Sequence, residues 1–262
     1  MVTDQLNVEV SGQGPALVLI HGWGLNGAVW HHIVDTLALH FEVHVVDLPG
    51  FGHSNQVPVK TQLSCWVDMI AKQIDKPAIW LGWSLGGLVA TQAATRYPQL
   101  VSKLVTVASS PKFVADADWH GIKPDVLNMF QSQLKTDFAV TLERFLAIQA
   151  MGSESAKQDI KNLKSILQQR PLPNESALKI GLDLLDSVDL REQLTDIKQP
   201  FLRMYGRLDS LVSHRAIKAI DQLAPQSEKV VFQKASHAPF ISHHQDFIEE
   251  LLTFTLNKVV DS

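Results

Sequence analysis

Residues 78–94 constrain the fold of this chain more than any other segment. An apolar run is followed by Gly82-Trp-Ser-Leu-Gly-Gly87 and then by a second apolar-rich run with a helical pattern. A strand that turns this sharply into a helix forces the residue at the turn into a strained backbone conformation. Small residues two positions away on either side let the backbones pass without a clash, and Gly82 and Gly86 supply them. We therefore predict a strand, a tight turn at Ser84 and a helix.

Ser84 is the candidate nucleophile of this segment. The strain at the turn lifts its hydroxyl clear of the sheet, to the start of the helix, where the first unpaired N–H groups point at it. A bare Gly-x-Ser-x-Gly pattern often arises by chance. One that lies between a strand and a helix is typical of the nucleophile elbow of serine hydrolases. The segment therefore predicts a hydrolase that uses Ser84.

Composition and charge exclude several other classes of protein. The chain has 262 residues, 45% apolar and 19% charged, as in a soluble globular protein with one large core, alone or with a small insertion. The net charge of −4 argues against nucleic acid or an anionic membrane as a general partner. The single cysteine, Cys65, permits a reducing compartment. Because no secretory signal and no membrane-spanning apolar run is visible, we predict a soluble cytoplasmic protein. We also expect it to be a monomer.

Short apolar runs, most of them β-branched and bounded by Gly or Pro, predict further buried parallel strands. They are Val8–Val10, Leu17–Ile20, Val43–Leu48, Lys103–Ala108, Phe201–Tyr205 and Lys229–Phe232. Helical patterns lie around them at 29–39, 63–74, 85–97, 213–223 and 243–257. This alternation predicts an α/β protein with a mostly parallel, doubly wound sheet and helices on both faces.

The alternation stops between Pro111 and about Asp186, where no strand-like run is found. Four helical patterns occupy this stretch: Pro124–Leu134, Phe138–Ala150, Ser155–Gln168 and Glu175–Leu185. A helical insertion between two strands of one sheet would lie over the strand ends as a lid. We therefore divide the chain into a core domain, residues 1–110 and 187–262, and a helical lid, residues 111–186.

Asp209 and His237 each follow the end of a predicted strand. Functional groups of an open parallel sheet gather beyond the carboxyl ends of its strands, and the order Ser84, Asp209, His237 is that of α/β-hydrolases. Alone, Asp209 could cap the helix near Ser213, and His237 is one of 11 histidines. Together the three predict a catalytic triad: His237 accepts the serine proton, Asp209 orients and stabilises the imidazolium, and an acyl-enzyme forms that water then hydrolyses.

The tetrahedral intermediate of such a reaction needs two hydrogen-bond donors for its oxyanion. The residue after the nucleophile supplies one, the N–H of Leu85, and the loop His21-Gly-Trp-Gly24 supplies the other through the N–H of Trp23. The indole of Trp23 would then form a wall of the acyl pocket, the alternative being that Trp23 only packs. We expect His21 to tie backbone together and to take no part in the chemistry.

Other candidate residues favour structural roles. His53 lies in a turn-rich segment, and Cys65 lies within a helical pattern whose apolar residues predict core packing. The histidine pairs 31–32 and 243–244 lack the one-face spacing and the partner ligands of a metal site. We expect no metal and no cofactor.

The predicted lid carries positive charge in a chain that is acidic overall. Between Arg144 and Arg170 there are five basic and two acidic residues, and Lys157, Lys161 and Lys164 share one helix face opposite the apolar one. This face is either simply solvated or a docking surface for an acidic partner whose cargo passes beneath the lid. Both interpretations stay open on the residues alone.

Six segments resemble those of the pimeloyl-[acyl-carrier protein] methyl ester carboxylesterases of biotin biosynthesis, which are α/β-hydrolases. They are His21–Asn26, Asp47–Gly52, Ile79–Leu88, Val107–Pro111, Glu143–Gln149 and Ser236–His243, and the resemblance covers nearly the whole chain. It implies the α/β-hydrolase fold and a substrate made of a pimeloyl chain on acyl carrier protein, capped as a methyl ester. Hydrolysis would release methanol and free the ω-carboxylate, which stops further elongation of the chain. We expect small esters to be hydrolysed in vitro.

The resemblance also implies which residues bind the substrate: Trp23, Ser84, Leu85, Phe145, Leu146, Ala147, Ile148, Gln149 and His237. Phe145 and Gln149 lie one helical turn apart and face the same way, and an aromatic wall suits a methylene chain; the alternative is that Phe145 belongs to the lid core. The family holds its carrier with lid arginines. Here the set is Arg144, Lys157, Lys161 and Lys164, and lysine contacts are less directional.

Three other functions remain open on the sequence. The first is a generalist short-chain carboxylesterase without a dedicated carrier, and the second is a ligand receptor built on an idle hydrolase fold. The third is a C–C bond hydrolase or perhydrolase, because triad and fold do not specify which bond is cut. Dehalogenases and epoxide hydrolases use a carboxylate at the elbow, so Ser84 disfavours them.

Overall fold

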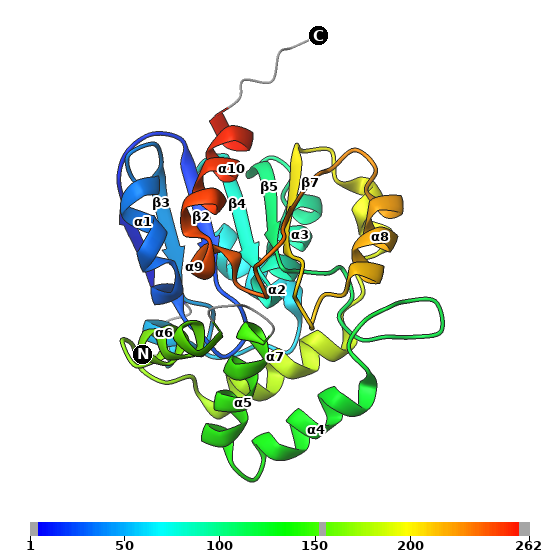
Figure 1. The fold of residues 1–262 in the computed structure, drawn as a ribbon. Coiled ribbons are helices and arrows are strands. Elements are labelled where there is room, and N and C mark those ends of the chain that lie inside the picture. The colour runs from blue at the N-terminus through cyan, green and yellow to red at the C-terminus, as the bar shows by residue number, and fades with distance from the viewer. Residues whose placement is uncertain (1–4, 152–155, 257–262) are drawn as a thin grey trace.

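A seven-stranded sheet forms the centre of this computed structural model, which describes residues 5–151 and 156–256. The strands are β1 (Val8–Ser11), β2 (Ala16–Ile20), β3 (Glu42–Val46), β4 (Ala78–Trp83), β5 (Val101–Val107), β6 (Phe201–Gly206) and β7 (Glu228–Phe232). Their order is β1-β3-β2-β4-β5-β6-β7 (Figure 1). All neighbours pair in parallel except β1 with β3. The mostly parallel sheet predicted from the sequence is therefore confirmed.

The central strands are buried on both faces, which explains their continuous apolar sequences. Every residue of β2, β4 and β6 is buried, whereas most of β7 at the edge of the sheet is not. The parallel register pairs Ile20 with Gly82 and Trp83 with Val107. The carboxyl ends of β2, β4 and β5 therefore meet at one edge of the sheet, and the loops that follow them are neighbours.

Helices cover both faces of the sheet (Figure 1). Helices α1 (His31–Leu37) and α10 (His244–Leu256) pack together, as do α2 (Leu63–Ala71) and α3 (Leu85–Arg96). The remaining core helices are α8 (His214–Leu223), the short α9 (Pro239–Ser242) and three 3₁₀ helices, η1 (Gly27–Trp30), η2 (Gly52–Ser54) and η3 (Glu192–Asp196). The helix predicted over 29–39 is divided between η1 and α1, and Asn257, the predicted end of the last helix, lies outside the described residues.

Four helices are inserted between β5 and β6: α4 (Pro124–Leu134), α5 (Phe138–Ala150), α6 (Ala156–Leu167) and α7 (Glu175–Ser187). Figure 1 shows them together at one end of the sheet. Asp137 and Asn174 cap α5 and α7 by accepting from backbone N–H groups in the first turn. The predicted α4 and α5 have the observed bounds, while Ser155, the predicted start of α6, lies outside the described residues. None of the helices in the described part of the chain has the length and apolar character needed to cross a membrane.

Candidate active site

Ser84 lies at the turn between β4 and α3 in a backbone conformation that side chains rarely adopt, with φ 55° and ψ −117°. The chain tolerates this turn because of the two glycines beside it. A Cβ atom on Gly82 would lie 2.1 Å from the carbonyl oxygen of Gly86, and one on Gly86 would lie 2.4 Å from that of Ile20. The backbone of Ser84 is held on both sides, since its N–H donates to Val107 O (2.9 Å) and its carbonyl accepts from Ser109 Oγ (2.8 Å).

Asp209 and His237 form a buried hydrogen-bonded pair. Nδ1 of His237 donates to Asp209 Oδ2 at 2.8 Å, and each side chain is 1% exposed. The other carboxylate oxygen of Asp209 accepts from the N–H groups of Leu211 (2.8 Å) and Val212 (3.1 Å). The alternative role of Asp209 as a helix cap does not apply, because Ser213 caps α8 instead. The pairing fixes the imidazole orientation and leaves Nε2 as its second functional nitrogen.

The His237 backbone lies beside the Ser84 turn. Trp83, the residue before Ser84, donates its indole N–H to the carbonyl of His237 at 2.8 Å, and the two rings are 5.8 Å apart. Nε2 of His237 is buried and has no hydrogen-bond partner among the described residues, so it is not bonded to the serine hydroxyl in this structure. A nitrogen without a competing partner is available to accept a proton.

The loop after β2 passes directly over Ser84, because a Cβ atom on Gly22 would lie 3.2 Å from the Cβ of Ser84. His21 ties this loop to its neighbour: Nδ1 donates to Gly22 O at 2.8 Å, and Nε2 accepts from the N–H of Leu48 at 3.0 Å. Burial away from water lowers the pKa of His21 to about 4, so the ring is neutral at pH 7. These contacts agree with the structural role expected for His21.

The two expected oxyanion donors lie next to this turn. Leu85 is the first residue of α3, and Trp23 follows Gly22 in the loop. The indole of Trp23 is fully buried against the inserted helices: it donates to Leu178 O of α7 at 2.8 Å and packs edge-on against Phe145 of α5 at 4.6 Å. A Cβ atom on Gly181 of α7 would lie 2.6 Å from the indole, so a larger residue there would displace it.

Of the predicted substrate residues of α5, Phe145 and Gln149 contact residues of this site. Phe145 and Leu146 are buried, and Ala147 and Ile148 are half-buried. Phe145 packs between Trp23 and Phe130 of α4, so it is part of the packing within the insertion as well as a neighbour of the loop. The carbonyl of Gln149 accepts from the N–H of His237 at 3.0 Å, while its side-chain oxygen is buried without a partner among the described residues.

The predicted docking residues differ in how freely their charges face solvent. Arg144, Lys157 and Lys161 are exposed, whereas Lys164 forms an ion pair with Glu143 at 3.0 Å. Arg170 is one of the five basic residues between positions 144 and 170, but it does not add to this positive surface. Its guanidinium is buried and bridges two carboxylates.

Arg170 joins the α6–α7 connection to the core of the protein. It donates from Nη1 to Asp47 at 2.8 Å and from Nη2 to Glu9 at 2.6 Å. Asp47 is fully buried and also accepts from the N–H groups of Gly27 (2.6 Å) and His53 (2.8 Å). The sequence carries no signal for this long-range pairing.

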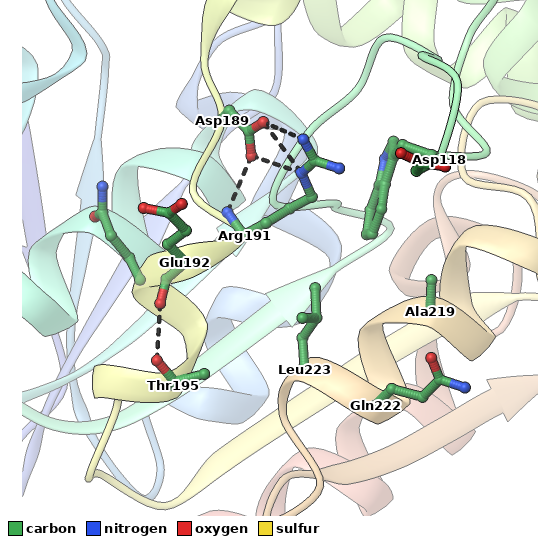
Figure 2. A pocket seen from close by; sticks show the side chains of 10 residues that line it. Asp118, Asp189, Arg191, Glu192, Thr195, Ala219, Gln222 and Leu223 are labelled. Carbon is green, nitrogen blue, oxygen red and sulfur yellow. Dashed lines mark hydrogen bonds and ion pairs between the residues drawn. The ribbon is translucent and has the colours of Figure 1, made fainter.

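A wide pocket of about 800 Å³ lies elsewhere, between the loop that follows β5, η3 and α8 (Figure 2). Asp189 and Arg191, which form a close ion pair, line this pocket together with the apolar side chains of Leu223 and Ala219. None of the predicted catalytic or binding residues lines it. Across the described residues there is also no group of three or more His, Cys, Asp or Glu side chains that could hold a metal ion.

The chain matches known proteins over most of its length. A family model described as the alpha/beta hydrolase fold matches residues 15–244. The chain is 52% identical to a pimeloyl-[acyl-carrier protein] methyl ester esterase of Aliivibrio fischeri, over 97% of this chain and 98% of that one. It is 54% identical to the enzyme of the same name from Photobacterium profundum, over 97% and 99%.

Solved structures with a similar fold are more distant in sequence. An esterase from Exiguobacterium antarcticum superposes with a TM-score of 0.87 at 21% identity, covering 96% of both chains. The enol-lactonase from Burkholderia xenovorans LB400 superposes with a TM-score of 0.85 at 19% identity, also over 96% of both chains. At such identities the likeness concerns the fold alone.

Proposed function

The chain belongs to the alpha/beta hydrolase family and, within it, to the pimeloyl-[acyl-carrier protein] methyl ester esterases, and from this membership we propose that it cleaves the methyl ester of a pimeloyl chain on acyl carrier protein. The products are methanol and a pimeloyl-carrier with a free ω-carboxylate, an intermediate of biotin synthesis. The enzyme is a carboxylic ester hydrolase of the serine type and needs no cofactor for this reaction.

The observation that supports this chemistry best is the buried Asp209–His237 pair beside the strained Ser84 turn. A serine hydroxyl is a weak nucleophile until a base removes its proton, and the base must be held in one tautomer. The hydrogen bond to Asp209 holds the Nδ1 proton of His237, so Nε2 is the atom that takes the proton of Ser84. We assign the catalytic roles to these three residues.

The reaction proceeds through an acyl-enzyme. Ser84 Oγ attacks the ester carbonyl as His237 takes its proton, and His237 then gives this proton to the departing methoxy group, which leaves as methanol. Water, deprotonated by the same imidazole, attacks the acyl-enzyme and releases the carboxylic acid. The N–H groups of Leu85 and Trp23 stabilise the oxyanion in both steps.

The inserted helices α4–α7 act as a lid in this proposal. Ser84 is only 3% exposed, and His237 is fully buried. The indole of Trp23 is covered by Phe145 of α5 and held by its hydrogen bond to α7. A substrate therefore reaches Ser84 only when α5 and α7 move away from the loop after β2. The exposed Arg144, Lys157 and Lys161 offer positive charge to an acidic carrier at the outer surface of this lid.

Mass spectrometry of the carrier-bound product tests the proposal directly. Pimeloyl methyl ester on its carrier should lose about 14 mass units, the exchange of methyl for hydrogen, when it is incubated with the wild-type protein. Ser84→Ala keeps the Cβ atom and the fold but lacks the nucleophile, so turnover should fall at least about 1000-fold. A fluorophosphonate should label the wild-type protein and leave Ser84→Ala unlabelled.

A survey of p-nitrophenyl esters beside this experiment separates the generalist esterase and the receptor from the proposed function. A generalist esterase would hydrolyse a range of p-nitrophenyl esters while showing no preference for the carrier-bound ester. A receptor on an idle fold would show no turnover and no label on Ser84. Wild-type rates in Ser84→Ala would overturn the triad assignment altogether.

A further inference from the structure

The end of helix α5 is bonded directly to the loop that carries His237. The N–H of His237 donates to the carbonyl of Gln149 at 3.0 Å, and the hydroxyl of Ser236 donates to the carbonyl of Met151 at 2.9 Å. Adjacent residues of the loop therefore bond to carbonyls two residues apart at the helix end. The last carbonyls of a helix have no partners within it, so outside donors are needed there.

Because both donor residues are buried, the two hydrogen bonds and the position of α5 depend on each other. His237 is fully buried, and Ser236 is 3% exposed. A buried N–H or hydroxyl that loses its partner carries a large desolvation cost, so it stays paired. If α5 moves away, both donors must form new hydrogen bonds with water, and the backbone of His237 loses its hydrogen bond to Gln149.

The core side holds the same histidine through different contacts. Trp83 donates to its carbonyl at 2.8 Å, and Asp209 accepts from its ring at 2.8 Å. His237 is thus fixed by the nucleophile strand and by Asp209 on one side, and by α5 on the other. Of these supports, only the α5 contacts come from the inserted helices.

Packing around the Ser236 contact leaves little freedom. Leu163 of α6, Ala238 and Ile241 enclose about 10 Å³ of free space beside Ser236 and Gln149. Such a space holds at most about one water molecule. Little space is therefore left beside the Ser236 side chain while α5 and α6 are seated.

We propose that Ser236 is a positioning residue that fastens the end of α5 to the catalytic loop, so that the backbone of His237 is held in its place beside the Ser84 turn only while the inserted helices are closed. Ser236 touches no reacting atom in this assignment and acts through the His237 backbone. The proposal rests on the role of His237 given under Proposed function. It predicts that loosening the Ser236 contact slows the chemical steps without weakening the binding of a small ester.

The test compares Ser236→Ala with Ser242→Ala. Ser242 belongs to the same segment, but its hydroxyl bonds within that segment, to Ala238 O and His243. With p-nitrophenyl acetate as substrate, we expect kcat per fluorophosphonate-labelled site to fall about 5- to 10-fold in Ser236→Ala, with KM within about twofold. Ser242→Ala should keep both parameters within about twofold of wild type, and Ser236→Thr, which retains the hydroxyl, should recover most of the lost kcat.

Hydrogen exchange by mass spectrometry supplies a second readout. Amides of residues 138–150 and 233–240 should exchange faster in Ser236→Ala than in Ser242→Ala, because the loop and the helix end separate more often. Faster exchange with unchanged kcat would overturn the proposal, since the contact would then only seat the helices. A loss of kcat equal in both variants would also overturn it.

Failure of the positioning role of Ser236 can be told apart from failure of the proposed function. If the wild-type protein hydrolyses p-nitrophenyl acetate but releases no methanol from the carrier-bound ester, the proposed substrate is wrong while the comparison at Ser236 still decides the positioning role. If Ser84→Ala hydrolyses the small ester at the wild-type rate, the assignment of His237 as base fails, and the positioning role of Ser236 falls with it.

Discussion

At the scale of single residues, His21 shows how a buried ring fixes the loop that passes over the nucleophile. Its Nδ1 proton is committed to Gly22 O and its Nε2 lone pair to the Leu48 N–H, so one neutral tautomer satisfies both neighbours. A second proton on the ring would abolish the bond from Leu48. The position of Trp23, two residues further on, therefore depends on His21 staying neutral.

We expect His21 to make the protein less stable as the pH falls from 6.5 to 4. The unfolded histidine has a pKa near 6.5, whereas burial lowers the pKa in the folded protein to about 4. Between these values the unfolded state binds a proton that the folded state does not, so the free energy of unfolding decreases with falling pH. Neutral His21 contributes fully to the free energy of unfolding above pH 6.5. About 3 kcal/mol of this contribution is lost by pH 4, and the His21 contribution decreases no further below that pH.

Urea unfolding between pH 7.5 and 4.5 measures this contribution. His21→Asn should be less stable than wild type at pH 7.5. As the pH is lowered, however, its free energy of unfolding should decrease less steeply than that of wild type, and the two slopes should differ by up to about 1.4 kcal/mol per pH unit. His53→Asn, which replaces an exposed histidine, is the matched control. Parallel curves for wild type and His21→Asn would show that His21 takes no part in the acid response.

Residues that belong to a local motif or follow the end of a predicted strand could be predicted from the sequence, whereas a contact between distant residues that carry no such signal could not. The strained turn at Ser84 follows from two glycines within four positions of each other, and the structure confirms it. The pairing of Asp209 with His237 follows from the rule that strand ends gather. Arg170 bonds to Asp47, which lies 123 positions away in the sequence, and no local pattern predicts such a contact.

At the scale of elements, prediction succeeds where a periodic pattern is long. Helices α4 and α5 have the predicted bounds, and α7 begins at the predicted residue, because each presents several turns of amphipathic sequence. The short α9 and the 3₁₀ helices η2 and η3 were not predicted, since three to five residues carry no measurable period. Asn174 before α7 is a cap signal that the sequence does contain.

Helix α6 is the element on which the proposed carrier docking depends. Lys157 and Lys161 lie one turn apart on its exposed face, whereas Leu163 and Leu167 are buried, as expected for opposite sides of the helix. The ion pair of Lys164 with Glu143 offsets its charge, so it contributes less to a long-range field. The attraction for an acidic partner therefore comes chiefly from the first two lysines and Arg144.

Reversing both lysines, Lys157→Glu with Lys161→Glu, should raise KM for the carrier-bound ester about tenfold at low salt and leave KM for p-nitrophenyl acetate unchanged. The reason is that repulsion acts on the acidic carrier and not on a neutral small ester. The effect should shrink in about 0.5 M salt, which screens exposed charges. Arg215→Glu with Lys218→Glu on α8 makes the same change in net charge away from α6, and equal effects of the two double variants would rule out docking at α6.

At the scale of the whole molecule, the α/β-hydrolase fold predicted from alternation and motif order is confirmed by the family model and by the sheet. The strand order could not be predicted, because it depends on which strands pair at long range. The insertion is tied to the core at several distant points. Leu190 N bonds to Pro111 O where the chain enters and leaves it, Ser236 bonds to Met151 O beside α5, and Arg170 reaches the core between α6 and α7.

The Arg170 contact should contribute most to stability among these points. The Arg170 and Asp47 side chains are 3% and 0% exposed, so removing the guanidinium leaves a fully buried carboxylate without its counter-charge. Arg170→Ala should therefore lower the free energy of unfolding in urea by about 3 to 5 kcal/mol. Arg96 makes a comparable two-point contact with Asp68, but its side chain is 45% exposed, so Arg96→Ala should lower the free energy of unfolding far less than Arg170→Ala does. Arg170→Lys should recover only part of the loss, because an ammonium cannot span Asp47 and Glu9 as the planar fork does. A loss in Arg170→Ala no larger than in Arg96→Ala would mean that the insertion stays seated without this contact.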